Sequence, residues 1–177
     1  MPTSPATEHQ TAPIPAWLAT VDAQRSLARL VARTIADTLT TQFPGAAYLT
    51  LMIQEETPRD WQLFPENVRN ATGDVLFDFE GAMPPLGPEH AELRAQWGHL
   101  APNDPFALRT MLRYLHINGA VFDRLPEDLD DSDDDEVRLC LLLSAEARPH
   151  KWEHEGDDPW DVETRRLRPY SAAKAQP

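Results

Sequence analysis

The sequence His150-Lys151-Trp152-Glu153-His154 contains residue types that could hold a metal ion and activate a water molecule. On a helix, two histidines four residues apart lie on the same face and can share a zinc ion. Glu153 would then be the base that activates a zinc-bound water. These five residues give one enzymatic hypothesis, a zinc-dependent hydrolase with His150 and His154 as metal ligands.

The residues around this string argue against a peptidase. The string matches the H-x-x-E-H motif of inverted zinc metallopeptidases, but Pro149 and Gly156 leave room for barely two helical turns. Those peptidases also need a further acidic ligand well downstream, and only 23 residues follow His154. A bound structural zinc ion, or a surface segment in which Trp152 packs on the domain, are the alternatives. We expect no cofactor.

A dense run of carboxylates occupies residues 127–136 and is the second candidate site. Its members are Glu127, Asp128, Asp130, Asp131, Asp133, Asp134, Asp135 and Glu136. Asp131, Asp133 and Asp135 have the spacing of the first EF-hand ligands. The sixth and twelfth positions of that loop should be Gly and Glu, but here they are Glu136 and Leu142. We therefore interpret the run as solvated charge that could bind a basic protein partner.

The net charge of −13 excludes several classes of partner. Nucleic-acid binding needs clustered Lys and Arg, and an anionic membrane surface would repel this chain. No apolar stretch approaches the ~20 residues of a membrane span. Cys140 is the only cysteine, and the first residues contain neither a basic start nor an apolar run, so we expect a reduced, cytoplasmic protein without a secretory signal. A net negative charge also keeps a protein soluble and monomeric, so the charge by itself does not require a binding partner.

Other catalytic signatures are absent from the sequence. It contains no G-x-S-x-G, Walker loop, G-x-G-x-x-G or C-x-x-C pattern. Three hypotheses follow. The first is a non-enzymatic binding or regulatory protein, such as an inhibitor, immunity-type or adaptor module. The second is the zinc-dependent hydrolase, and the third is a structural or assembly component. The sequence leaves the oligomeric state open.

The elements that position these residues begin with a long helix. Residues 1–15 are rich in Pro, Thr, Ser and Ala, and we expect a disordered arm. From Trp17, apolar residues recur every three or four positions until Pro44-Gly45, with Thr20 as the expected N-cap. The expected buried stripe is Leu18, Val21, Leu27, Leu30, Val31, Ile35 and Leu39. Arg25, Arg29 and Arg33 line one side, as a stripe for anionic groups or as a solvated face.

The strongest strand pattern lies between Ala46 and Phe79. Apolar residues occupy both sides of the run 47–53, with Ala47 and Leu49 on the same face, which favours a central strand. A second strand follows, interrupted at Pro65, and 71–74 forms a turn in which Gly73 takes positive φ. A third strand has Val75, Phe77 and Phe79 on one face. These strands predict an antiparallel meander.

Two helices and a late strand complete the predicted fold. Residues 89–97 form a short helix, and a helix capped at Asn103-Asp104 runs from Pro105 to Asn118-Gly119. Its expected buried stripe is Phe106, Leu108, Met111, Leu112 and Leu115. The apolar run 137–144 predicts a fourth strand. The sequence thus indicates a single α+β domain over 16–148, with a sheet of about four strands, and a polar tail over 149–177. We expect Arg165, Arg166 and Arg168 to bring this tail back onto the acidic run.

Overall fold

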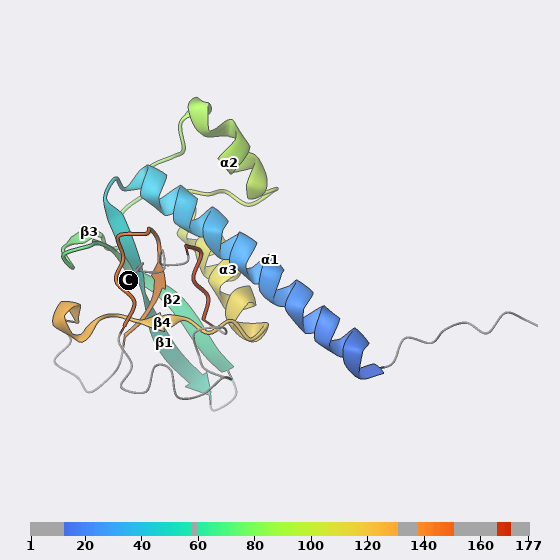
Figure 1. Ribbon diagram of the computed structural model, residues 1–177. Helices are drawn as coiled ribbons and strands as arrows, with labels where there is room; N and C mark the ends of the chain where they lie inside the picture. Colours follow the sequence, from blue (N-terminus) through green and yellow to red (C-terminus); the bar gives the residue numbers. More distant parts are fainter. Residues whose placement is uncertain (1–12, 58–59, 131–137, 151–165, 171–177) are drawn as a thin grey trace, which may run out of the picture.

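The computed structural model describes residues 13–57, 60–130, 138–150 and 166–170, and the structural statements below refer to these ranges. In chain order the elements are α1 (Pro13–Gln42), β1 (Ala46–Thr57), β2 (Asp60–Asn70), β3 (Val75–Phe77), the 3₁₀ turn η1 (Pro88–His90), α2 (Ala91–Gln96), α3 (Pro105–Ile117), β4 (Asp123–Arg124), the 3₁₀ turn η2 (Glu127–Leu129) and β5 (Leu139–Leu142). Within these ranges, three α-helices and an antiparallel five-stranded sheet form one body (Figure 1). The α+β class is confirmed.

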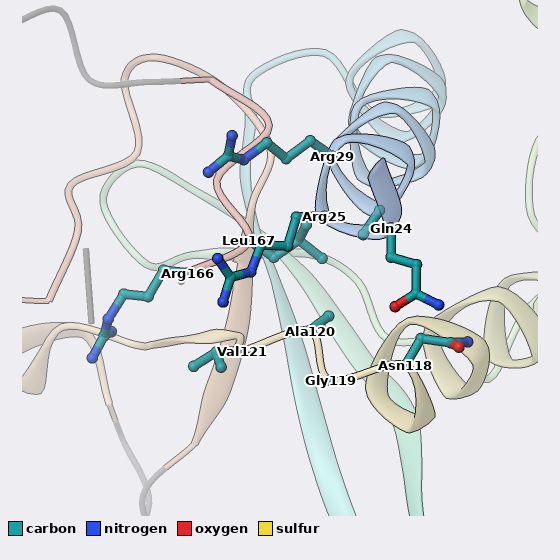
Figure 2. A pocket seen from close by; sticks show the side chains of 10 residues that line it. Gln24, Arg25, Arg29, Asn118, Gly119, Ala120, Val121, Arg166 and Leu167 are labelled. Carbon is teal, nitrogen blue, oxygen red and sulfur yellow. The ribbon is translucent and has the colours of Figure 1, made fainter. Parts of the chain in front are cut away.

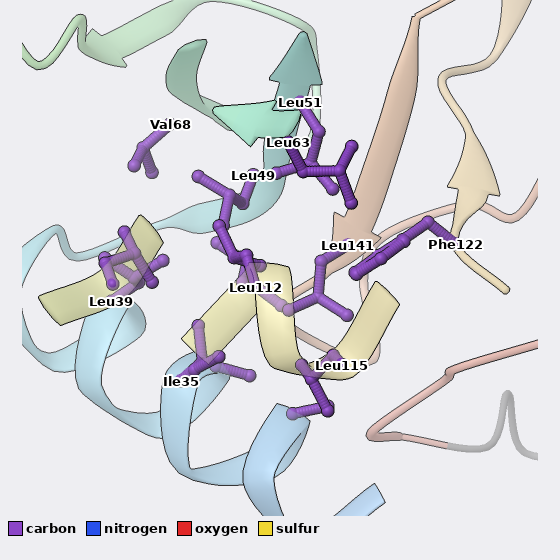
Figure 3. Packing of buried hydrophobic residues seen from close by; sticks show 14 of the residues in the cluster. Ile35, Leu39, Leu49, Leu51, Leu63, Val68, Leu112, Leu115, Phe122 and Leu141 are labelled. Atoms are coloured by element: carbon purple, nitrogen blue, oxygen red, sulfur yellow. The ribbon is translucent and has the colours of Figure 1, made fainter. Parts of the chain in front are cut away.

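The sheet has the order β3-β2-β1-β5-β4, so β1 lies at its centre. Side chains on both faces of β1 are buried. Leu49 and Leu51 join the main core, which contains residues of α1, α3, β2 and β5, whereas Tyr48 joins a smaller cluster with Cys140 and Leu142. Figure 3 shows the main core between the sheet and the helices. The predictions of a central strand and of a three-stranded meander are both confirmed.

Two irregularities in the pairing of β1 with β2 change the predicted alternation. A register shift between Ala46 and Tyr48 places Ala47 in the smaller cluster, although the sequence pattern put it on the face of Leu49. A bulge adds one residue to a strand, so the side chains before it change face. A second shift lies opposite Pro65, and β2 continues through it as one strand. Proline is tolerated there because a bulge leaves a backbone position unpaired.

The turn between β2 and β3 has the predicted conformation. Gly73 has φ of 92°, and its N–H donates to the carbonyl of Asn70 at 3.1 Å. The third strand is shorter than expected because Phe79 has φ of 62°, a conformation that ends the extended run. Phe77 and Phe79 still pack on the main core, whereas Val75 is 50% exposed.

The helix α1 begins at Pro13, before the expected start near Trp17. Thr20 lies inside the helix, where its hydroxyl donates to the carbonyl of Ala16 at 3.0 Å, so it is not the N-cap. The face that enters the core is Ala32, Ile35, Ala36, Thr38 and Leu39. Leu27 and Leu30, expected on that face, are 62% and 64% exposed. Leu30 lies five residues from Ile35, roughly 140° around the helix, so the two cannot share one narrow face.

The helix α3 starts and ends at the predicted residues. The Asp104 carboxylate accepts a hydrogen bond from the backbone N–H of Phe106 at 2.9 Å, and Gly119 has φ of 81° just beyond the last turn. Leu108, Leu112 and Leu115 are buried as expected. Phe106 is not: its side chain is 70% exposed.

The end of the described chain corrects two expectations. The sheet has a fifth strand, β4, of only two polar residues, which no apolar periodicity could reveal. Leu167 is 4% exposed in the main core, and its N–H donates to the carbonyl of Val121 at 2.7 Å. Residues 166–170, five of the seven described residues of the expected tail 149–177, therefore belong to the folded body.

Candidate functional site

The described start of the acidic run is attached to the body by ion pairs. Asp128, in η2, lies 2.6 Å from the guanidinium of Arg148, and both side chains are more than half exposed. Asp130 lies 3.7 Å from Arg138, which also contacts Glu66 at 3.1 Å. Asp130 and Arg138 are the residues on either side of the segment 131–137. The two described residues that flank this segment therefore lie next to each other.

A buried tyrosine fixes the backbone of Arg148. The Tyr48 hydroxyl accepts a hydrogen bond from the Arg148 N–H at 2.8 Å and donates to the Arg148 carbonyl at 3.2 Å. Burial raises the pKa of Tyr48 above its usual 10.0, so the hydroxyl stays protonated. At the protein surface, the hydrogen bond that the Arg148 guanidinium donates lowers the pKa of the Asp128 carboxyl below its usual 3.8. Asp128 is therefore a charged group with a defined position.

Most of the acidic run and most of the H-x-x-E-H string lie outside the described residues. Only Glu127, Asp128 and Asp130 of the predicted partner site are described; Asp131, Asp133, Asp134, Asp135 and Glu136 are not. His150 is half-buried and follows the strand β5 by a short loop, whereas Glu153 and His154 are outside the described ranges. No group of three or more potential metal ligands occurs among the described residues. The calcium and zinc hypotheses remain untested.

A buried ionic cluster at the edge strand was not anticipated. The Asp123 carboxylate in β4 is bound by the guanidinium groups of Arg166 and Arg168, the second at 2.7 Å. The exposed fractions of these side chains are 1%, 3% and 12%. The arginine-rich end of the chain thus binds Asp123, which precedes the acidic run 127–136. The hypothesis that this end folds back on the run is not tested, because five of the run's eight carboxylates lie outside the described residues.

The lone cysteine has no catalytic environment. Cys140 lies in the centre of β5 and is fully buried in the smaller cluster. Burial raises the pKa of its thiol well above 9.0, with the nearby Asp123 carboxylate adding to the effect. Because the thiolate is the reactive form of cysteine, this thiol is inert. Cys140 serves packing.

The three arginines on one side of α1 have different surroundings. Arg33 stacks over the Tyr170 ring at 5.3 Å and lies 3.9 Å from Asp37. Arg25 and Arg29 instead line a surface pocket of about 220 Å³ (Figure 2). Its other walls are the residues after α3 and the segment Arg166–Leu167. The sequence placed all three arginines on one stripe, and only the folded chain separates them.

Within the described ranges, no helix combines the length and apolar character needed to cross a membrane. Comparison with known proteins gives no family assignment: the chain matches no protein-family model, no curated protein and no solved structure.

Proposed function

We propose that this chain is a non-enzymatic binding protein that engages a basic protein partner through two acidic segments. The observation that carries the proposal is the Asp128–Arg148 ion pair, which joins the start of the first segment to a described residue five positions before the second. The first segment is the run 127–136, and the second is 153–163.

The charge of the chain is concentrated in these two segments. Eight of the 29 acidic residues lie in 127–136 and six in 153–163, so about half of all carboxylates occupy 21 positions. The second group is Glu153, Glu155, Asp157, Asp158, Asp161 and Glu163. A basic surface would meet many like charges at once, which favours fast, electrostatically steered association.

The described geometry supports a common origin for the two segments. Asp130 and Arg138, which flank 131–137, form an ion pair, and Asp128 binds Arg148, which precedes Glu153 by five positions. The Tyr48 hydroxyl, buried in the sheet, fixes the backbone at Arg148. The electrostatic fields of like charges that lie near one point of a surface reinforce one another in front of that point. The fields of like charges spread over the whole surface point in different directions and partly cancel.

The test is a comparison of two variants with equal net charge. In the first, Asp131, Asp133, Asp134 and Asp135 become Asn and Glu136 becomes Gln. In the control, five exposed carboxylates of the described body are changed in the same way: Asp22, Asp78, Glu80, Glu89 and Glu92. Each variant removes five negative charges, so a difference between them reports position and not total charge.

The parent chain and both variants are used as baits to capture proteins. Each basic protein that is captured is then purified, and its affinity for each of the three chains is measured by titration. We expect the first variant to bind at least about tenfold more weakly than the control. The affinity of the parent chain should fall steeply between low and high salt, because dissolved ions screen exposed charges and the Debye length is only about 8 Å at physiological ionic strength. Equal affinities for the two variants, or affinity independent of salt, would overturn the proposal. Absence of any captured basic protein would count against it as well.

A further inference from the structure

The pocket at α1 has positively charged walls in an otherwise acidic protein. Among the described residues that line it, three of ten are arginines and none is a carboxylate, although the chain has a net charge of −13. Arg25 and Arg29 project from successive turns of α1, and Gln24 and Asn118 supply side-chain amides at one end (Figure 2). The volume of about 220 Å³ suits a small molecule.

The three arginines differ in what they can offer to a ligand. The Arg166 guanidinium binds the buried Asp123 carboxylate, and Figure 2 shows it directed away from Arg25 and Gln24. Arg25 lies 3.8 Å from Asp22, but both side chains are about half exposed or more, and such surface pairs are worth little. A guanidinium carries five N–H donors, so one existing contact leaves donors for an anion. Arg29 also has an interaction of its own, and the remaining N–H donors of Arg25 and Arg29 are the groups that face the pocket.

The remaining lining of the pocket would accommodate an apolar body. Ala28 comes from α1, Ala120 and Val121 follow α3, and Leu167 is held in place by its hydrogen bond to Val121. The Asn118 amide nitrogen donates to the Tyr114 carbonyl at 2.7 Å, which fixes this side chain and leaves its oxygen as an acceptor. A few charged donors together with small apolar groups are the features of a small-molecule site.

We infer that this pocket binds a small organic oxyanion, with Arg25 and Arg29 forming hydrogen bonds to the anionic group and Ala28, Val121 and Leu167 contacting the organic body. Phosphate and carboxylate share the required chemistry, because each accepts paired N–H donors from guanidinium groups. This site uses none of the acidic segments, so it stands apart from the proposed partner binding.

Titration of the ¹⁵N-labelled chain with phenyl phosphate and with benzoate tests the inference. We expect saturable shifts of the amide signals of Gly119, Ala120, Val121 and Leu167, and none with phenol or benzamide, which lack the negative charge. The relative affinities of the two anions then distinguish a phosphate site from a carboxylate site. Shifts that do not saturate for either anion, or that lie elsewhere on the chain, would rule the site out.

Arg33, on the same helix, provides a control for position, and the single variants R25Q and R29Q match its loss of one charge. In R25Q/R29Q the affinity should fall by about tenfold or more, because two charge-assisted contacts are lost. R33Q removes the same kind of charge one helical turn further along, outside the pocket, and should bind within about twofold of the parent chain. R25K/R29K keeps the charge and should recover part of the affinity. Equal affinity of R25Q/R29Q and R33Q would contradict the assignment.

Discussion

Asp123 and Arg166, 43 positions apart, form an ion pair in which the two side chains are only 1% and 3% exposed. The pair joins the edge strand β4 to the last described segment of the chain. Arg168 binds the second oxygen of the same carboxylate. A two-residue strand has few ladder hydrogen bonds of its own, so this buried carboxylate holds both β4 and the segment 166–170 against the body.

Replacing Asp123 by Asn should therefore be strongly destabilising. The change keeps the shape but removes the negative charge that the buried Arg166 and the partly buried Arg168 contact. Breaking a buried ion pair in this way typically costs about 3–5 kcal/mol. The measurement is the free energy of unfolding from urea titration, followed by the fluorescence of the tryptophans.

The matched control is Asp130→Asn. Its partner Arg138 is 3.7 Å away, and the two side chains are 18% and 24% exposed, so solvent screens the interaction. We expect a loss of about 1 kcal/mol or less. If Asp123→Asn costs no more than Asp130→Asn, the buried cluster does not hold the edge strand.

A second prediction concerns the turn between β2 and β3, where Gly73 packs against η2. Gly73 has φ of +92°, and a Cβ built on it would lie 3.2 Å from Cδ2 of Leu129. Gly73→Ala thus combines backbone strain with a steric clash, and strain alone costs about 1 kcal/mol. Gly45 has φ of +86° but nothing within 4 Å of an added Cβ, so Gly45→Ala isolates the strain. In urea titrations we expect Gly73→Ala to lose more stability than Gly45→Ala. Equal losses would mean that Leu129 moves without cost.

Local sequence signals predicted the parts of this fold that depend on local physics. The turn at Gly73 and the N-cap at Asp104 are both observed as predicted. A backbone with positive φ favours glycine, and an N–H without a partner in the first turn of a helix favours a side-chain acceptor such as aspartate. The central position of β1 followed from apolar residues on both of its sides. These signals act within a few residues and need no knowledge of tertiary packing.

Features created by tertiary contacts were missed. Leu30 and Ile35 are both aliphatic residues of the apolar repeat in α1. Leu30 is nevertheless 64% exposed and Ile35 only 1% exposed, because the sheet and α3 cover only one side of α1. Asp123 and Arg166 give no joint signal in the chain, since 43 residues separate them. The pocket at Arg25 depends likewise on Asn118 and Leu167, which only folding brings near α1.

Tyr170 gives a prediction for alkaline pH. Its hydroxyl donates to the Asp37 carboxylate, and burial together with this hydrogen bond raises its pKa to about 12. An unfolded tyrosine ionises near 10.0, so the folded state favours the neutral form. The resulting stability is complete below pH 10 and is lost as the pH rises toward 12.

The free energy of unfolding of the parent chain should therefore fall more between pH 10 and 12 than that of Tyr170→Phe, which has no hydroxyl to ionise. Tyr48, whose pKa burial also raises, is present in both proteins and cancels in the comparison. Urea titrations at intervals of pH give both curves. Parallel curves would show that Tyr170 and Asp37 are not in contact in solution.

The Asp128–Arg148 pair can be tested directly through its titration. Because the hydrogen bond from Arg148 lowers the pKa of Asp128, Arg148→Gln should return the pKa of this carboxyl toward 3.8, as followed by the ¹³C shift of its carboxyl group. A carboxyl group whose pKa is lowered by folding stabilises the folded state at pH values above its ordinary pKa. This stabilisation is lost as the pH falls through the pKa of the folded state. Both side chains are more than half exposed, so the change in stability is small and the titration is the sharper measurement.

Arg113→Gln supplies the control for this test, because it removes one positive charge from an exposed position of α3. It should leave the pKa of Asp128 within experimental error of the parent value. If the two variants shift Asp128 equally, the effect is one of net charge and the two acidic segments have no shared anchor. If only Arg148→Gln shifts it, the ion pair exists in solution. The same two variants then show whether partner association slows when that anchor is broken and the net charge is held equal.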